Sequence, residues 1–432
     1  MKTDNIRKIF FFRDFDFILI ITCTPSQKLF ITQKKIGDME VGIVGKPNVG
    51  KSTFFNACTM GHAEIANYPF TTIDSNIGVA YVTSQCPCKE LNLKCNPQNS
   101  QCMNGTRLIP VKIIDVAGLV PGASEGRGLG NKFLDDISRA KVLIHVVDAS
   151  GSTDEEGRSC KIGTHDPLED IKFLENEIDS WFFNILHKNW KKFSKRIHLQ
   201  NEDFVKVVAE HFSGLEIKEE DLHLALKKCN LDPERPDTWK DEELREFSTV
   251  LRKVTKPIVI AANKMDIAPK ENIERLKESG HKVVPTSAEA ELILRKAKDF
   301  VDYIPGSGDF TIKSDKLTEK QKHALDIIKN VMKEYGSTGV VQCLNYAIFD
   351  VLERIVVYPV EDETHFTDKK GNVLPDAYLM KKGSTPKDLA YKIHTEIGKS
   401  FIYAVNARTK MRIAEDYQLK NGDIIKIVSA AK

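Results

Sequence analysis

The segment that most constrains the fold runs from Gly45 to Ser52 and reads Gly-Lys-Pro-Asn-Val-Gly-Lys-Ser. Two glycines separated by four residues and followed by Lys-Ser are typical of a phosphate-binding loop between a strand and a helix. The apolar run 41–44 before the loop predicts the strand, and residues 53–57 predict the start of the helix. The glycines allow a sharp turn, so that successive N–H groups and the helix N-terminus face one phosphate.

Two side chains at the end of this loop have expected roles in phosphate chemistry. We expect Lys51 to bring positive charge to the outer phosphates and the Ser52 hydroxyl to bind Mg²⁺. The other expected nucleotide-binding residues of the loop are Gly45, Lys46, Pro47, Asn48, Val49, Gly50 and Thr53.

From residue 40 to 288, apolar runs alternate with helical stretches, which predicts a doubly wound, mostly parallel α/β sheet of the P-loop NTPase type. Such sheets bind ligands at the carboxyl ends of their strands. The predicted strands are Val41–Val44, Ile77–Val82, Val111–Asp115, Val142–Asp148, Pro257–Asn263 and Lys282–Thr286.

Two further segments are expected to sense the γ-phosphate. Asp115 ends a predicted strand in Asp-Val-Ala-Gly118, where the carboxylate would hold Mg²⁺ through water and the Gly118 N–H would meet the γ-phosphate. The segment Asn67-Tyr-Pro-Phe-Thr-Thr-Ile73 lies between the two motifs. We expect Thr72 to supply a second Mg²⁺ ligand when the γ-phosphate is present.

The sequence Asn263-Lys-Met-Asp266 and the sequence Thr286-Ser-Ala288 each end a predicted strand. The guanine N1–H and 2-amino groups form a pair of donors that one carboxylate, Asp266, accepts together. We expect Asn263 to bridge to the phosphate loop, and the stem of Lys264 to cover the ring. Ser287 belongs to the second motif, in which the Ala288 N–H would reach the guanine oxygen.

With these motifs in order, the chain resembles the Obg-related branch of translation-factor-type GTPases, and specifically the relatives of YchF and Obg that end in a TGS domain. The residues that carry the resemblance are G-K-P-N-V-G-K-S-T-F-F-N, N-Y-P-F-T-T-I, D-V-A-G-L-V-P-G-A-S-E-G-R-G-L-G, N-K-M-D and T-S-A. The resemblance implies a Mg²⁺-dependent GTPase switch with slow turnover until a partner completes the site. The alternatives are a YchF-like ATPase and a nucleotide-binding scaffold with negligible hydrolysis.

Comparison with this family adds three expectations. YchF has a base motif that ends in Glu and is associated with ATP, whereas Asp266 is intact here, which favours GTP. Leu119 stands where Ras-like enzymes have a water-orienting glutamine, and it cannot hydrogen-bond that water. Asn48 occupies the position that helps to hold K⁺ in potassium-dependent relatives, although it would equally cap the loop by local hydrogen bonds.

The interval between the strands ending at Asp148 and Asn263 is much longer than a helical crossover needs, and it predicts a helical insertion over about 165–252. Its first helix is expected from about Asp170, on the helical spacing of apolar residues. Residues 187–196 mix basic and aromatic side chains, which suits RNA, but a solvated helix face with buried aromatic rings is the alternative.

Residues 291–350 are expected to form a helical linker region, with a helix from Thr318 to Tyr335 that stops at Gly336. Residues 351–431 resemble a TGS domain, a β-grasp module of ubiquitin-like fold. Its strand 355–360 precedes a helix expected over 385–397, with Thr385 as N-cap and Gly398 as stop. The family associates this domain with a ribosome, rRNA or tRNA-linked partner, and the insertion is a second candidate surface.

Residues 1–38 differ from the rest, and we expect Met39 to be the true or an alternative start; a disordered tail and a targeting segment are the alternatives. Their apolar runs are too short to span a bilayer, and we expect no membrane partner. With 63 basic and 61 acidic residues, no global field favours nucleic acid or membrane.

Nine scattered cysteines in a long chain favour a reducing cytoplasm over a disulfide scaffold. Four of them cluster in sequence: Cys86, Cys88, Cys95 and Cys102. Their spacing is not common for zinc ribbons, so we expect reduced, unliganded thiols, with zinc or redox pairing as alternatives.

Overall fold

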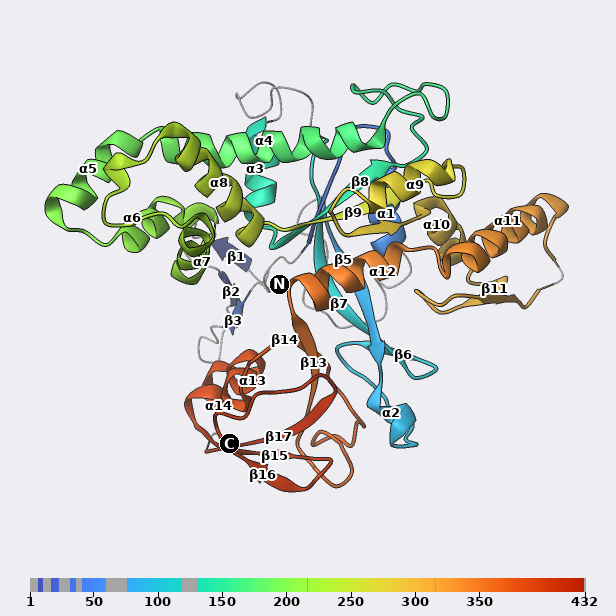
Figure 1. The fold of residues 1–432 in the computed structure, drawn as a ribbon. Coiled ribbons are helices and arrows are strands. Elements are labelled where there is room, and N and C mark those ends of the chain that lie inside the picture. The colour runs from blue at the N-terminus through green and yellow to red at the C-terminus, as the bar shows by residue number, and fades with distance from the viewer. Residues whose placement is uncertain are drawn as a thin grey trace, which may run out of the picture. The chain divides into compact units, whose positions relative to one another are not determined.

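The computed structural model describes residues 7–10, 17–22, 32–35, 41–59, 76–118, 130–215, 217–314 and 316–430 (Figure 1). The chain divides into two units, residues 1–39 and 40–432. The first unit is an antiparallel sheet in the order β1 (Arg7–Phe10), β2 (Phe17–Thr22), β3 (Thr32–Lys35). These strands were not predicted from the sequence.

A largely parallel sheet forms the centre of the second unit. Among the described residues its order is β10-β9-β8-β4-β7-β5, with β6 paired to β7. Among the described strands of this sheet, β5 and β6 pair antiparallel with β7 and the other pairs are parallel, so the predicted mostly parallel sheet is confirmed. The strands are β4 (Val41–Val44), β5 (Ile77–Gln85), β6 (Gln101–Met103), β7 (Thr106–Asp115), β8 (Val142–Asp148), β9 (Ile258–Asn263) and β10 (Val283–Pro285).

Helices cover both faces of this sheet, as its near-continuous apolar strands predict. Along β9, Val259 and Ala261 pack into one core with α1 (Lys51–Thr59), α10 (Ala288–Lys296) and α12 (Val340–Asn345). The alternate residues Ile260 and Ala262 pack into another core with residues of α4 (Pro167–His187), α9 (Lys270–Lys277) and α11 (Glu319–Tyr335). The predicted doubly wound architecture is therefore present. Two further helices described in this part of the chain are α2 (Pro87–Glu90) and α3 (Gly130–Ser138).

The long interval between β8 and β9 folds into helices, as predicted. They are α4 (Pro167–His187), α5 (Trp190–Gln200), α6 (Phe204–His211), α7 (Glu219–Cys229) and α8 (Asp241–Thr255), with short 3-10 turns at Ser213–Leu215 and Pro236–Thr238. Helix α4 begins three residues before the predicted start because Asp166 caps it and Pro167 occupies its first turn.

The basic and aromatic stretch 187–196 lies at the end of α4 and in α5. Trp190 and Phe193 are 6 % and 7 % exposed, and Trp190 packs against Trp239 with ring centroids 5.2 Å apart. The aromatic rings are thus part of the insertion's core, and the lysines of the stretch are exposed. This supports the alternative of a solvated helix face and removes these rings as platforms for base stacking.

Residues 291–350 contain more than helices. A hairpin of β11 (Val301–Tyr303) and β12 (Phe310–Ile312) precedes α11, and a π-helical turn (Tyr346–Val351) follows α12. Helix α11 lies where the helix from Thr318 to Tyr335 was predicted; Thr318 is its N-cap, and it stops at Gly336 as predicted. The hairpin was not predicted, because its short strands carry little alternation of apolar and polar residues.

The C-terminal sheet has the order β14-β13-β17-β15-β16, with β13 and β17 parallel, which fits the predicted β-grasp fold. Its strands are β13 (Arg354–Val360), β14 (Tyr378–Lys381), β15 (Phe401–Asn406), β16 (Met411–Ile413) and β17 (Asp423–Ser429). Residues of β13 and β17 belong to the same hydrophobic core as the central sheet.

The predicted single helix over 385–397 is wrong in its second half. Thr385 and Pro386 begin α13 (Pro386–Ile393) as predicted, but His394 is extended and caps a second helix, α14 (Thr395–Lys399). Gly398 lies inside α14 and does not stop a helix. A Cβ at this position would approach the Tyr391 ring to 2.4 Å, so the glycine serves close packing.

None of the described helices is long and apolar enough to cross a lipid bilayer.

The turn between α11 and α12 packs against the end of β10. We therefore expect alanine substitutions at its two glycines to destabilise the protein to different extents. Gly339 has φ +80°, and a Cβ there would approach the Pro285 carbonyl oxygen to 1.9 Å. Gly336 has φ +83° but open space around it. We expect Gly336→Ala to lower the free energy of unfolding by about 1 kcal/mol, and Gly339→Ala by at least about 2 kcal/mol more, measured by calorimetry. Equal losses would contradict this assignment.

Candidate functional site

The phosphate loop connects β4 to α1 at the carboxyl edge of the central sheet. Gly45 has φ +153°, and a Cβ there would come within 2.6 Å of the Val146 carbonyl oxygen on β8. Helix α1 begins at Lys51, so its first N–H groups have no partner within the helix. Because β4 lies between β7 and β8, the loop faces the ends of both strands. This geometry suits an anionic ligand.

Lys51 and Asp115 are 64 positions apart in the sequence and form an ion pair, with 2.9 Å between Lys51 Nζ and Asp115 Oδ1. Ser52 is exposed at the start of α1. Gly118 lies close to the loop, because a Cβ on it would be 3.6 Å from the Gly45 carbonyl oxygen. Hydroxyl and carboxylate oxygens are the ligands that Mg²⁺ prefers, so Ser52 and Asp115 fit the expected metal.

Asn263, at the end of β9, links the phosphate loop to the segment after β10. Its Nδ2 donates to the Val49 carbonyl oxygen at 2.9 Å, and its Oδ1 accepts from the Ala288 N–H at 3.0 Å. A Cβ on Gly50 would come within 2.4 Å of Asn263 Nδ2, so the second loop glycine leaves room for this side chain. The structure thus contains the expected bridge to the phosphate loop.

The two charged residues of the base motif, Lys264 and Asp266, differ in exposure. Asp266 is exposed, and Lys264 is partly buried with φ +62°. Lys264 Nζ donates to Asp148 Oδ2 at 2.8 Å and to Ser152 Oγ at 3.2 Å. This contact fixes the Lys264 stem at the edge where the base is expected.

Asp148, which ends β8, is fully buried and was not among the expected site residues. Burial alone would raise the pKa of its carboxyl, but hydrogen bonds from Lys264 and Ser150 outweigh burial and hold the pKa below its usual value. The signal that could have found it is its position: an acidic residue at the carboxyl end of a strand next to β4.

Ser287 and Ala288 form the start of α10. The Ser287 hydroxyl caps this helix by accepting from the Ala290 N–H, and the Ser287 N–H donates to the Thr338 carbonyl oxygen at 2.9 Å. The Ala288 N–H donates to Asn263, so its expected contact with the guanine oxygen stays a prediction.

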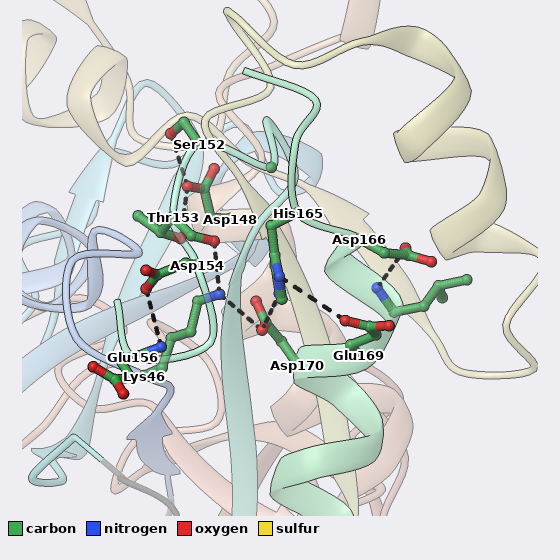
Figure 2. Close-up of polar contacts among 12 residues, drawn as sticks. Lys46, Asp148, Ser152, Thr153, Asp154, Glu156, His165, Asp166, Glu169 and Asp170 are labelled. Atoms are coloured by element: carbon green, nitrogen blue, oxygen red, sulfur yellow. Dashed lines mark hydrogen bonds and ion pairs between the residues drawn. The ribbon is translucent and has the colours of Figure 1, made fainter. Parts of the chain in front are cut away.

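The loop that follows β8 lies against the phosphate loop and reaches the start of α4 (Figure 2). Lys46 is 4 % exposed, and its Nζ donates to Asp170 Oδ1 at 2.8 Å and to the Thr153 carbonyl oxygen at 3.0 Å. His165 Nε2 lies 2.7 Å from the same Asp170 oxygen. Burial raises the pKa of Asp170 despite the opposing effect of Lys46 and His165.

Lys46 was expected to bind nucleotide, and its side chain is instead committed to the helical insertion. Only its backbone is left for a phosphate. Asn48 has φ +62°, and its Nδ2 donates to the Gly157 carbonyl oxygen at 2.9 Å. A Cβ on Gly157 would come within 2.6 Å of the Pro47 carbonyl oxygen, so these loops pack tightly. No pattern in the sequence predicted these contacts.

Thr72 and Leu119 lie outside the described residues, as do residues 67–73 and 119–129. Thr53 is partly buried in the first turn of α1. The roles expected for the site residues stay predictions.

Three protein-family models match the chain. A "50S ribosome-binding GTPase" model matches residues 40–177, an "Obg-like GTPase YGR210-like, G4 motif-containing domain" model matches residues 261–362, and a "TGS domain" model matches residues 364–429.

Two relatives of known sequence match most of the length of this chain. An uncharacterized GTP-binding protein of Methanocaldococcus jannaschii is 56 % identical over 396 residues, which are 91 % of this chain and 99 % of that protein. The ribosome-binding ATPase YchF of Bacillus subtilis is 27 % identical over 376 residues, covering 85 % of this chain and 87 % of that protein.

A solved structure, that of a GTP-binding protein from Pyrococcus horikoshii OT3, is 48 % identical. It has a TM-score of 0.73, with 91 % of this chain and 100 % of that chain covered. Motifs, fold and relatives agree, and the chain therefore belongs to the Obg/YchF-related family of P-loop GTP-binding proteins with a C-terminal TGS domain.

Proposed function

We propose that this protein hydrolyses GTP to GDP and phosphate in a Mg²⁺-dependent reaction and acts as a switch on a ribosome or RNA partner in the cytoplasm. The observation that carries the choice of GTP is the arrangement at the end of β9. Asn263 is tied to the phosphate loop by the 2.9 Å hydrogen bond to Val49, and Asp266 is exposed beside it. A carboxylate held there can accept from both guanine donors.

The chemistry is that of positioned charge. Lys51 and the α1 N-terminus would bind the outer phosphates, and Ser52 and Asp115 would hold Mg²⁺, which neutralises charge on the phosphates. The 2.9 Å pairing of Lys51 with Asp115 shows that the two groups reach the same point of the site. When nucleotide and Mg²⁺ bind, Lys51 would contact a phosphate and Asp115 would contact the cation in place of each other.

The partner is proposed on narrower support. One matching family model is described as ribosome-binding, and the B. subtilis relative is named a ribosome-binding ATPase. In this chain the insertion retains exposed lysines on α5, and the TGS domain is present. Because the aromatic rings of 187–196 are buried, we propose that any contact of this segment with RNA is made to phosphates.

Asp266→Asn tests the base assignment. We expect wild type to bind GTP more tightly than ATP, and the variant to lose roughly 30- to 150-fold in GTP affinity, because a carboxylate that accepts two hydrogen bonds is replaced. Xanthine nucleotide, which offers a carbonyl at that edge, should bind the variant better than wild type. Competition against a fluorescent nucleotide measures this, with Asp302→Asn on β11 as the control. Equal or tighter ATP binding by wild type would place the chain with the YchF-like ATPases.

Single-turnover hydrolysis tests the reaction and the role of Asn48. We expect GTP cleavage that Lys51→Ala abolishes, and a rate roughly tenfold higher in K⁺ than in Na⁺, because K⁺ adds charge stabilisation between the phosphates. Asn48→Ala should remove the difference between the two ions. Hydrolysis no faster than that of Lys51→Ala would favour the scaffold alternative, and equal rates in the two salts would refute the potassium site.

Asp170 tests whether the insertion supports the phosphate loop. Asp170→Ala leaves the buried Lys46 ammonium without its counter-charge, and we expect a loss of about 3 kcal/mol in stability together with weaker GTP binding. The neighbouring Glu169→Gln, with a side chain 58 % exposed, should change neither. The double variant Lys46→Met/Asp170→Leu should recover stability because no charge remains buried. Denaturant unfolding measures the stability, and nucleotide titration measures the GTP affinity. If Asp170→Ala had the stability and GTP affinity of wild type, the proposed support of the phosphate loop by the insertion would be wrong.

A further inference from the structure

Four cysteine thiols converge at the far end of the β5–β7 hairpin, away from the nucleotide motifs in sequence. Cys86 precedes α2 (Pro87–Glu90), Cys88 lies in α2, Cys95 follows it in a loop, and Cys102 lies on β6. All four sulfur atoms are within 4.8 Å of one another. We call this group the thiol cluster.

The spacing of the sulfurs is that of ligands around one ion. Cys86 Sγ and Cys95 Sγ are 3.9 Å apart, and Cys88 Sγ and Cys102 Sγ are 3.7 Å apart. Four thiolates bound tetrahedrally at about 2.3 Å from zinc lie about 3.8 Å from each other. A disulfide would need about 2.05 Å between two sulfurs, and a polynuclear iron–sulfur cluster would hold its cysteines farther apart than a single ion does.

A buried cation beside the cluster is a second, independent observation. Arg107 on β7 is the direct cross-strand partner of Cys102, so the two side chains share one face of the sheet. Arg107 is 0 % exposed, and its two terminal nitrogens donate to Ser100 Oγ and to the Leu374 carbonyl oxygen, while its Nε has no hydrogen-bond partner within the described part of the chain. It forms no salt bridge with any described residue, although the charge of Asp376 acts on it from a distance. A buried cation that is not in contact with a carboxylate is costly. Four thiolates around Zn²⁺ carry a net charge of −2 and would compensate it.

We propose that Cys86, Cys88, Cys95 and Cys102 bind one structural Zn²⁺. All four coordination positions are filled by protein, so the site is closed and leaves no position for substrate. Each thiol loses its proton on binding, and the free energy of metal binding adds to that of folding. This site is separate from the proposed nucleotide chemistry.

The proposed ion would hold the loop that docks on the TGS domain. The Asn96 N–H donates to the Val373 carbonyl oxygen at 3.1 Å. Asn99 Oδ1 accepts from the Ala377 N–H at 2.9 Å, and Asn99 Nδ2 donates to the Ala377 carbonyl oxygen at 3.2 Å. Asn96 and Asn99, which make these contacts, lie between Cys95 and Cys102 in the sequence. Zinc at the cluster would therefore order the surface that fixes the TGS domain to the hairpin.

Metal content of the full chain tests the proposal. We expect one zinc per chain by mass spectrometry of metals in wild type, and at least tenfold less in Cys88→Ser. Cys229→Ser at the end of α7 is the matched control and should keep its zinc. In hydrogen exchange, the amides of 373 and 377 should exchange faster in Cys88→Ser and be unchanged in Cys229→Ser.

A second measurement uses wild type alone, so that its result does not depend on whether Cys88→Ser folds. Wild type produced in medium with Co²⁺ in place of zinc should show the intense visible bands of tetrahedral cobalt with thiolate charge transfer. Less than about 0.2 zinc per chain together with no cobalt bands, iron in place of zinc, or disulfides among the four cysteines by peptide mass spectrometry would each overturn the proposal. None of these outcomes depends on nucleotide binding or hydrolysis.

Discussion

The side chain of Asn263 connects three segments that are far apart in the sequence. Its amide donates to Val49 in the phosphate loop and accepts from Ala288 at the start of α10, and it is only 3 % exposed. An amide buried with one end unpaired would cost about 1–3 kcal/mol. The two hydrogen bonds therefore hold the phosphate loop and the base edge at one spacing, and the glycine at position 50 is the residue that lets the amide approach.

A second set of polar contacts surrounds this link and extends it to the helical insertion. Lys264 is held by the buried Asp148, and Lys46 is held by Asp170 in the first turn of α4. The phosphate loop is thus tied on one side to the base motif and on the other to the insertion. The insertion is therefore in direct polar contact with the phosphate loop through Asp170 and Lys46.

The parallel sheet and most of its strands follow from the sequence, because short Val/Ile-rich runs that alternate with helical stretches are typical of strands buried on both faces. Val142–Asp148 was predicted to the residue. The single helix predicted over 385–397 was wrong in its second half, because the chain breaks at His394 and Gly398 packs against Tyr391 inside a second helix. The hairpin of β11 and β12 was missed for a similar reason: three-residue strands are defined by their neighbours.

The sequence by itself determined the candidate residues of the site, since Lys51, Ser52, Asp115, Asn263 and Asp266 stand in motifs whose spacing is typical of nucleotide-binding loops. It also determined the order of the domains. Only the tertiary structure decided that Lys46 serves the insertion, that Asp148 supports Lys264, and that four cysteines at an uncommon spacing meet within 4.8 Å. These outcomes depend on which strands become neighbours, and strand order is a long-range property that local patterns do not encode.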